Sequence, residues 1–451
     1  MDLSTELPTL DRAADDAVRD AVPPAAGELW ARGDRWRRRR RRGTAVGLTL
    51  GAVLVAALAG LTLQRSVPPE PAVAPGSGPT LPDRVWEVSP WLDVAVPREP
   101  VVAAQGHERG TWAGNTHGIA VLTGSGRYVF LDAPEVSGQG DAVVSPDGRH
   151  VAYWATGRTG GTPNTGHGQA SPVAGVAVLD VVSGEVTSHD FPTAHGLQPQ
   201  ALLWADAHTL LGAHFQWVVG DDGPDEQLGA GNDEAQWRWD LDATGGPDPL
   251  DLPAGEVDSF TEAAGDLLLV GRHLHDLRTG VDTRLSPRGG IGSTGASGSS
   301  AFLRTDGVLA QVGGSGLPDR FPNRVTMADL TSGDGAPRRV PGTAESAQVL
   351  GWRDDDHLVV VRRVDPTAPG IYLDTYVISS VNVTTGGNQV LVDGGGAILP
   401  WTWASDLLSA PVAVGVEPPD PLDPRLVAGA VACTVLLTLG GLGLWRRRAR
   451  P

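Results

Sequence analysis

Two long apolar stretches stand out in the hydrophobic pattern of the chain, one near each end. Residues 43–63 read GTAVGLTLGAVLVAALAGLTL, and residues 425–445 hold a second stretch that carries no charge from Leu426 to Trp445. Each spans about 20 residues, which is enough helix to cross roughly 30 Å of hydrocarbon. The pattern therefore predicts two transmembrane helices, with a lipid bilayer as their partner.

Arginines beside these stretches set the expected topology. They are Arg37, Arg38, Arg39, Arg40, Arg41 and Arg42 before the first stretch, and Arg446, Arg447 and Arg448 after the second. Arginine-rich flanks stay on the cytoplasmic side of a membrane. We expect a two-pass protein of the cell membrane. Its leader (residues 1–42) and tail (residues 446–451) are cytoplasmic, and its main domain is extracytoplasmic.

Between the two stretches the pattern is that of strands. Short alternating or apolar runs such as GIAVL, HVAYWA, GVAVLDVV and HLVVVRRV recur, separated by turn residues. Two Pro-rich segments, residues 64–80 and 410–424, read as spacers on either side of an outer domain at residues 81–409. Both spacers lead to the same membrane, so we expect the two ends of this domain to lie close together.

The strand-like runs repeat in two alternating elements. One element ends a strand and turns on a glycine, at Gly184, Gly245, Gly280, Gly333 and Gly386, with Asp180, Asp240, Asp276 and Asp329 shortly before four of them. The intervals average about 50 residues, and the short one before Gly280 suggests a truncated or misread repeat. The other element sets a polar turn before an apolar strand, as in VVSPDGRHVAYW, LLWADAHTLLG, LGWRDDDHLVVV and WTWASDLLSA. Its recurring tryptophans, Trp204, Trp352 and Trp403, are predicted to anchor the core between repeats.

One repeat resembles a known family. The segment VSPDGRHVAYWA (Val144 to Ala155) and the later VAVLDVVSGEV are similar to the repeat of TolB-type and WD-repeat-like β-propellers. The resemblance implies an all-β ectodomain in which four-stranded blades close into a ring. Repeats that start near residues 112, 145, 204, 264, 303, 352 and 403 predict six or seven blades. The last start leaves too few residues for a blade, so strands within residues 81–95 are expected to complete it.

Charge and cysteine content narrow the function classes. The chain has a formal net charge of −18, and most of its acids lie in the outer domain. An acidic exterior argues against nucleic acid as a partner. The one cysteine, Cys433, lies inside the second apolar stretch, so the outer domain is stabilised without a disulfide.

The cytoplasmic leader offers a second interaction site. Residues 9–22 place apolar side chains at helical spacing, which predicts an amphipathic helix. This helix, a Pro break and an arginine run resemble the leaders of actinobacterial membrane proteins, some of them encoded beside extracytoplasmic-function sigma factors. The resemblance implies a cytoplasmic protein partner at residues 9–42, although residues 1–43 lack the His and Cys of a zinc-type anti-sigma domain.

The sequence shows no catalytic constellation. It has no G-x-S-x-G, no H-E-x-x-H and no phosphate loop, so we predict no catalytic residue, no cofactor and no metal. His273 and His275 share one face of a strand, but the acid next to them in the sequence, Asp276, points to the other face. We therefore interpret the two histidines as a polar strand face.

These observations favour a non-catalytic binding scaffold or sensor for a protein, a peptide or a glycan. Trp217, Trp237 and Trp239 flank a Gly/Asp-rich insert at residues 220–234, which we predict to be a ligand loop. One alternative is a signal transducer that docks a cytoplasmic regulator through residues 9–42. The other is a propeller-type hydrolase that uses acids brought together from distant blades.

Overall fold

The computed structural model describes residues 78–139, 142–164, 171–219, 228–250, 252, 260–271, 273–285, 301–313, 324–331, 337–364, 376–395, 401–421 and 423–449. The chain divides into two compact units. One is Val67–Asp423, and the other consists of the two ends, Met1–Ser66 and Pro424–Pro451.

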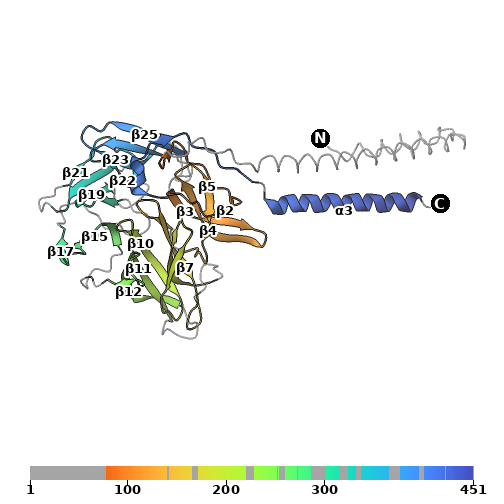
Figure 1. The fold of residues 1–451 in the computed structure, drawn as a ribbon, viewed down its shortest axis with the longest axis horizontal. Coiled ribbons are helices and arrows are strands. Elements are labelled where there is room, and N and C mark those ends of the chain that lie inside the picture. Colours follow the sequence, from red (N-terminus) through yellow and green to blue (C-terminus); the bar gives the residue numbers. More distant parts are fainter. Residues whose placement is uncertain are drawn as a thin grey trace, which may run out of the picture. The chain divides into compact units, whose positions relative to one another are not determined.

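The larger unit is a six-bladed β-propeller (Figure 1). The first three blades, written from the inner to the outer strand, are as follows. Blade 1 has β26 (Thr402–Trp403), β3 (Val101–Thr111), β4 (Gly114–Thr123), β5 (Tyr128–Leu131) and β2 (Val94–Ala95). Blade 2 has β6 (Val143–Val144), β7 (His150–Thr156), β8 (Val173–Asp180) and β9 (Val186–Asp190). Blade 3 has β10 (Leu197–Trp204), β11 (Thr209–Val219), β12 (Leu228–Asp240) and β13 (Asp248–Pro249).

The other three blades have four strands each. Blade 4 has β14 (Phe260–Ala264), β15 (Leu267–Val270), β16 (His273–Asp276) and β17 (Val281–Arg284). Blade 5 has β18 (Ala301–Leu303), β19 (Val308–Gly313), β20 (Arg324–Asp329) and β21 (Arg338–Arg339). Blade 6 has β22 (Ser346–Asp354), β23 (His357–Arg363), β24 (Tyr376–Asn382) and β25 (Asn388–Gly395).

The hydrophobic core lies between the blades. Alternating side chains of each strand point to opposite faces of the sheet, so each blade contributes apolar residues to both neighbours. Buried clusters join blade 1 to 2, 2 to 3, 3 to 4, 4 to 5 and 5 to 6. A further cluster, which includes Val102, Leu122, Val359 and Ile378, joins blade 6 back to blade 1. The ring is therefore closed by packing as well as by strand pairing.

Segments from the two ends of the domain close the ring. Strand β26 pairs with β3 and forms the inner strand of blade 1, while β2 forms its outer strand. Next to them β1 (Leu81–Pro82) pairs with β27 (Val412–Ala413), with Leu81 opposite Val412. The expectation that the domain ends meet is confirmed. The predicted starts near residues 112 and 403 belong to one blade, which is why the structure has six blades and not seven.

The repeated turn elements are also confirmed. Asp180 accepts hydrogen bonds at Oδ1 from the backbone N–H groups of Val182 and Ser183, at 2.8 and 3.1 Å. Asn382 does the same for Thr384 and Thr385 in blade 6. Gly184, in the same turn, has a φ of 81°, which glycine adopts without a steric penalty. These side chains fix the hairpin between the two outer strands of a blade.

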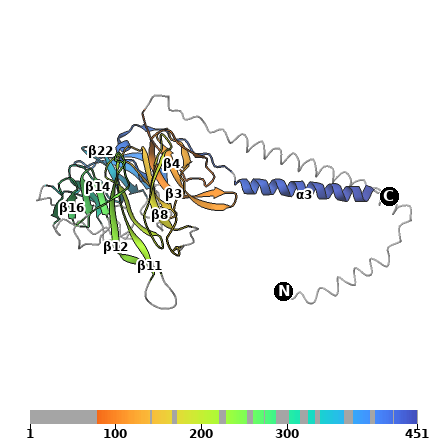
Figure 2. The same ribbon diagram turned by 60° about the horizontal axis from the view of Figure 1, so that its bottom comes forward.

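Blades 3 and 4 explain the uneven repeat intervals. Blade 4 has the full four strands, none longer than five residues, so the short interval before Gly280 is neither a truncation nor a misreading. In blade 3, β11 and β12 have 11 and 13 residues and lie side by side (Figure 2). The predicted insert at 220–234 is therefore partly strand, with Val219 opposite Leu228.

The C-terminal apolar stretch forms the helix α3 (Pro424–Ala449). Its segment Pro424–Gly441 is long and apolar enough to cross a membrane, and no residue of that segment is buried. The first predicted membrane helix, residues 43–63, lies outside the described residues, as do Arg37 to Arg42. The predicted spacer at 410–424 differs in part, because Val412 and Ala413 form β27 before the Pro-rich run.

Candidate functional site

A cavity of about 510 Å³, called here the mouth cavity, lies where the inner turns of the blades meet. Its lining comes from blades 2 to 6 and from the segment after β26: Pro146, residues 204–207, 263–264, 302–305 and 352–355, and Ser405, Asp406 and Ser409. The last three belong to the short 3₁₀ helix η4 (Ser405–Ser409), which follows β26. The inner strands of successive blades contact one another, so these turns gather around the axis of the ring. The second repeated element of the sequence thus builds a single concave surface.

Acidic side chains outnumber basic ones in the mouth cavity. Four carboxylates line it, from Asp206, Asp354, Asp355 and Asp406, against the guanidinium groups of Arg304 and Arg353. The Asp206 and Asp354 carboxylates also accept backbone N–H groups in their own turns. Asp354 lies 2.8 Å from Nδ1 of His357 as well. The cavity therefore favours a ligand that carries positive charge.

Arg304 and Trp352 contact each other in the wall of the mouth cavity. The Arg304 guanidinium lies 4.7 Å from the centroid of the Trp352 ring and forms an ion pair with Asp306. The hydrogen bond to Asp306 and its negative charge outweigh burial, and together they raise the pKa of Arg304. A cation over an indole face contributes about 0.5–2 kcal/mol, depending on its desolvation. This contact joins blade 5 to blade 6 at the cavity.

Asp406 is the carboxylate that η4 contributes. Its backbone N–H donates to the carbonyl oxygen of Pro146 at 3.0 Å, which ties η4 to blade 2. Burial and then the charge of Asp147 raise the pKa of the Asp406 carboxyl. A carboxyl group whose charged form is disfavoured gains most from a cation brought next to it.

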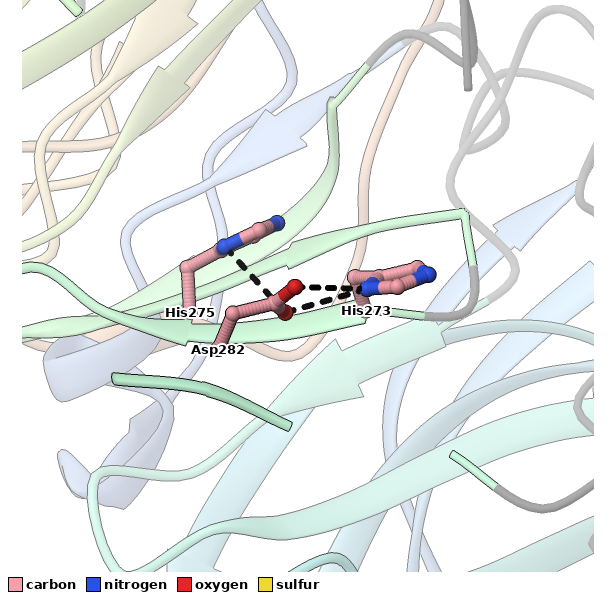
Figure 3. Close-up of side chains that lie close together, drawn as sticks. All are labelled: His273, His275 and Asp282. Carbon is pink, nitrogen blue, oxygen red and sulfur yellow. Dashed lines mark hydrogen bonds and ion pairs between the residues drawn. The ribbon is translucent and has the colours of Figure 1, made fainter. Parts of the chain in front are cut away.

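A second polar cluster lies on the outer hairpin of blade 4 (Figure 3). It consists of His273, His275 and Asp282, and is called here the His–Asp cluster. Nδ1 of His273 lies 3.0 Å from both carboxylate oxygens of Asp282, and Nδ1 of His275 lies 3.4 Å from Oδ1. The sequence pattern singles out the two histidines but not Asp282. The hairpin register, in which His275 lies opposite Asp282, is the signal that identifies it.

Asp276 lies at the end of β16 and has a separate role, in the hairpin turn. Its Oδ1 accepts the N–H groups of Arg278 and Thr279, both at 3.0 Å, inside the hairpin turn. These hydrogen bonds lower the pKa of the Asp276 carboxyl. Asp276 therefore shapes the turn that brings Asp282 to the histidines.

The predicted ligand loop is built differently from the expectation. Trp237 and Trp239 are 3% and 2% exposed and belong to the core between blades 2 and 3. Trp217 is half-buried, and its Nε1 donates to the carbonyl oxygen of Leu197. Because β11 and β12 continue past these positions, the Trp237 and Trp239 rings pack in the core and do not rim a loop. Residues 220–227 of the predicted insert lie outside the described residues.

One of the recurring tryptophans links two blades, as predicted. Trp204 is 8% exposed, and its Nε1 donates to the carbonyl oxygen of Val143 in blade 2 at 3.2 Å. Trp403 is equally buried and packs in the cluster between blades 6 and 1. Trp352 both packs against the core between blades 5 and 6 and lines the mouth cavity.

Comparisons with known proteins identify no family and find only remote structural likenesses. No protein-family model and no curated protein sequence matches the chain. Among solved structures, an oligogalacturonate lyase in complex with manganese is 12% identical, covering 67% of this chain and 78% of the lyase at a TM-score of 0.41. A putative TolB from Agrobacterium tumefaciens is 12% identical, and the match covers 66% of this chain and 92% of the TolB chain at a TM-score of 0.35. Dipeptidyl peptidase 4 from Porphyromonas gingivalis is 12% identical, and the match covers 64% of this chain and 44% of the peptidase at a TM-score of 0.34. Likenesses this remote carry no argument about chemistry, and the six-bladed ring rests on the strand pairing itself.

Proposed function

We propose that this chain is a membrane-anchored extracytoplasmic β-propeller that binds a ligand without transforming it, as a scaffold or sensor. The observation that carries the proposal is the mouth cavity, a concave surface that blades 2 to 6 and η4 share. Such convergence of loops on the axis is how a ring-shaped scaffold presents one site. The apolar helix α3, none of whose membrane-length segment is buried, supports the membrane anchor.

The chemistry of the cavity favours a protein or peptide ligand over a glycan. Four carboxylates face two guanidinium groups in its lining, and Arg304 already pairs with Asp306. A lysine or arginine side chain, or a free amino terminus, satisfies these carboxylates with charge-assisted hydrogen bonds. A neutral glycan gains less from them. We therefore expect the ligand to be a basic segment of a peptide or protein.

A binding screen tests this proposal. The full chain in lipid nanodiscs is exposed to a peptide library in which lysine and arginine are present or absent. We expect the unmodified chain to retain basic peptides. Asp355→Asn and Asp406→Asn should each weaken the affinity for these peptides about three- to tenfold, because each removes one attractive charge. Asp248→Asn is the matched control, since it removes the same charge on the exposed outer strand β13. Equal binding by all three variants would contradict a site in the cavity.

The transducer alternative predicts a different partner. A crosslinked pull-down from native membranes compares the full chain with a chain that lacks residues 1–30. A partner retained by both chains supports the scaffold. A cytosolic partner lost with the deletion assigns the leader a docking role. A screen against glycans and peptides tests the hydrolase alternative. Hydrolysis of one of these substrates that Asp406→Asn abolishes would favour it.

A further inference from the structure

The His–Asp cluster on blade 4 has the composition of a metal site. Two imidazoles and one carboxylate offer their ligand atoms from one hairpin, and these atoms all lie within 4.8 Å of one another. Figure 3 shows the two imidazole rings on either side of the Asp282 carboxylate, each with Nδ1 turned toward it. The rings are nearly parallel, with 19° between their planes and 6.0 Å between their centroids.

The distances from each imidazole to the carboxylate fit one shared ion. Two ligand atoms that lie 2.0–2.2 Å from the same metal are about 2.9–3.5 Å apart at octahedral or tetrahedral angles. The separations between Nδ1 and the carboxylate oxygens are 3.0 Å for His273 and 3.4 Å for His275. An ion can therefore replace the protons that each imidazole shares with the carboxylate, and the ligand atoms, all within 4.8 Å of one another, then draw closer around it.

One side of the cluster is apolar. Leu268 and Val270, the cross-strand partners of His275 and His273, are buried in the cluster between blades 3 and 4. This apolar floor limits competition from water.

The cluster remains accessible from one side. The side chains of His273 and Asp282 are 22% and 29% exposed, and that of His275 is 10% exposed. An ion can enter from the solvent and keep water at its remaining positions. Open positions of this kind distinguish a half-exposed site from a closed structural one.

We propose that His273, His275 and Asp282 bind a divalent transition-metal ion of the zinc class. Imidazole nitrogen suits Zn²⁺, Co²⁺ and Ni²⁺, whereas Ca²⁺ and Mg²⁺ select oxygen ligands. The site is independent of the mouth cavity, because it lies on the outer hairpin of one blade. The bound ion links β16 to the exposed strand β17 and so stabilises the outer edge of blade 4.

The test measures Zn²⁺ binding to the full chain, purified in detergent, freed of any histidine tag and stripped with a chelator. Titration against a zinc indicator is done in excess Mg²⁺, which saturates the acidic surface without occupying imidazoles. We expect about one equivalent of tightly bound Zn²⁺ and a higher thermal midpoint with the ion present. His273→Gln and Asp282→Asn are each expected to weaken binding at least about tenfold, since each removes a ligand.

His357→Gln is the matched control. His357 also pairs with an aspartate, Asp354, at 2.8 Å, but among the described residues no second histidine pairs with that carboxylate. This variant should bind Zn²⁺ like the unmodified chain. Near-ultraviolet circular dichroism of the tryptophans confirms that each variant is folded, and His273→Gln carries the test if Asp282→Asn does not fold. Absence of tight binding in the unmodified chain, or equal binding by the folded cluster variants, overturns the proposal.

Discussion

One buried histidine makes the stability of this fold depend on pH. His214 on β11 is 2% exposed, and its Nδ1 accepts a hydrogen bond from Nε1 of Trp237 at 3.3 Å. The Phe191 ring lies 4.6 Å away, centroid to centroid. Burial lowers the pKa of His214 to about 4. The folded protein therefore holds a neutral imidazole whose proton is on Nε2.

We predict that acid destabilises the propeller through His214. In the unfolded chain this histidine titrates near its unperturbed pKa of about 6.5. Between that value and about 4 the unfolded state binds more protons than the folded state, so stability falls as the pH drops through this window. At about pH 5 the loss from this one group is about 2 kcal/mol. Urea unfolding of the purified chain at neutral and mildly acidic pH measures it.

The variant His214→Gln isolates this contribution. A glutamine can accept the Trp237 N–H through Oε1 and does not titrate, so the difference in stability between the two pH values should shrink by the same amount. His117→Gln, at an exposed position of β4, is the control and should leave the difference unchanged. An unaltered pH dependence in His214→Gln would show that the acid sensitivity arises elsewhere.

At the scale of elements, the outer hairpins of blades 2 and 6 each depend on one capping side chain. Asp180 accepts two backbone N–H groups, and its Oδ2 also pairs with Arg149 at 3.0 Å. Asn382 fills the equivalent position in blade 6 and accepts its two N–H groups with an amide oxygen. The turn therefore needs an oxygen acceptor rather than a negative charge.

We predict that Asp180→Ala destabilises the domain by about 1–2 kcal/mol, since it leaves two turn N–H groups without their partner. Asp180→Asn should cost less than about 1 kcal/mol, because it keeps the acceptor and loses only a partly exposed ion pair. Denaturant unfolding of both variants measures the difference. If the two substitutions cost the same, the ion pair rather than the cap would be the stabilising contact.

The same hairpins show what could be predicted from sequence. A glycine with an acid shortly before it is a local signal, so the sequence predicts these turns, whereas the propeller class follows from the resemblance of one repeat to TolB-type propellers. Asp282 was missed because its position next to His275 depends on the register across the turn, which places residues seven apart side by side. The burial of Trp237 depends on how far β11 and β12 extend, a tertiary property that the Gly/Asp-rich composition of the insert conceals.

At the scale of the whole molecule, one threonine lies where the ring closes. The Thr402 hydroxyl, on β26, lies 3.0 and 2.9 Å from the carbonyl oxygens of Ala104 in blade 1 and Ala142 next to blade 2. Both alanines are buried. Removal of this donor leaves buried acceptors that water cannot easily reach. The contact joins residues almost 300 positions apart in the sequence.

We predict that Thr402→Val lowers the free energy of unfolding by about 1–2 kcal/mol, although valine has nearly the same volume. Thr402→Ser keeps the hydroxyl and should retain most of the stability. Thermal unfolding of the two variants, compared with the unmodified chain, measures the effect. Equal loss in both would mean that the methyl group, and not the hydrogen bond, holds the closing strand.

The closed ring also makes the membrane topology testable by cutting its two connections. Strands β1 and β27 pair near the ends of the propeller, and Gly415 donates its N–H to Asp83, so cuts outside these contacts leave the ring intact. A protease site is introduced within residues 417–421, another within residues 67–77, and both together in a third chain. Protease is then added to the outside of intact cells or spheroplasts.

If both apolar stretches span the membrane, either cut alone should leave the propeller bound, and only the double cut should release it. The remaining helix holds the domain after a single cut, because removing about 20 apolar residues from hydrocarbon is prohibitively costly. Release after the cut at 417–421 alone would show that residues 43–63 do not anchor the chain. Cleavage only in permeabilised cells would place the propeller in the cytoplasm and reverse the topology that the arginine blocks predict.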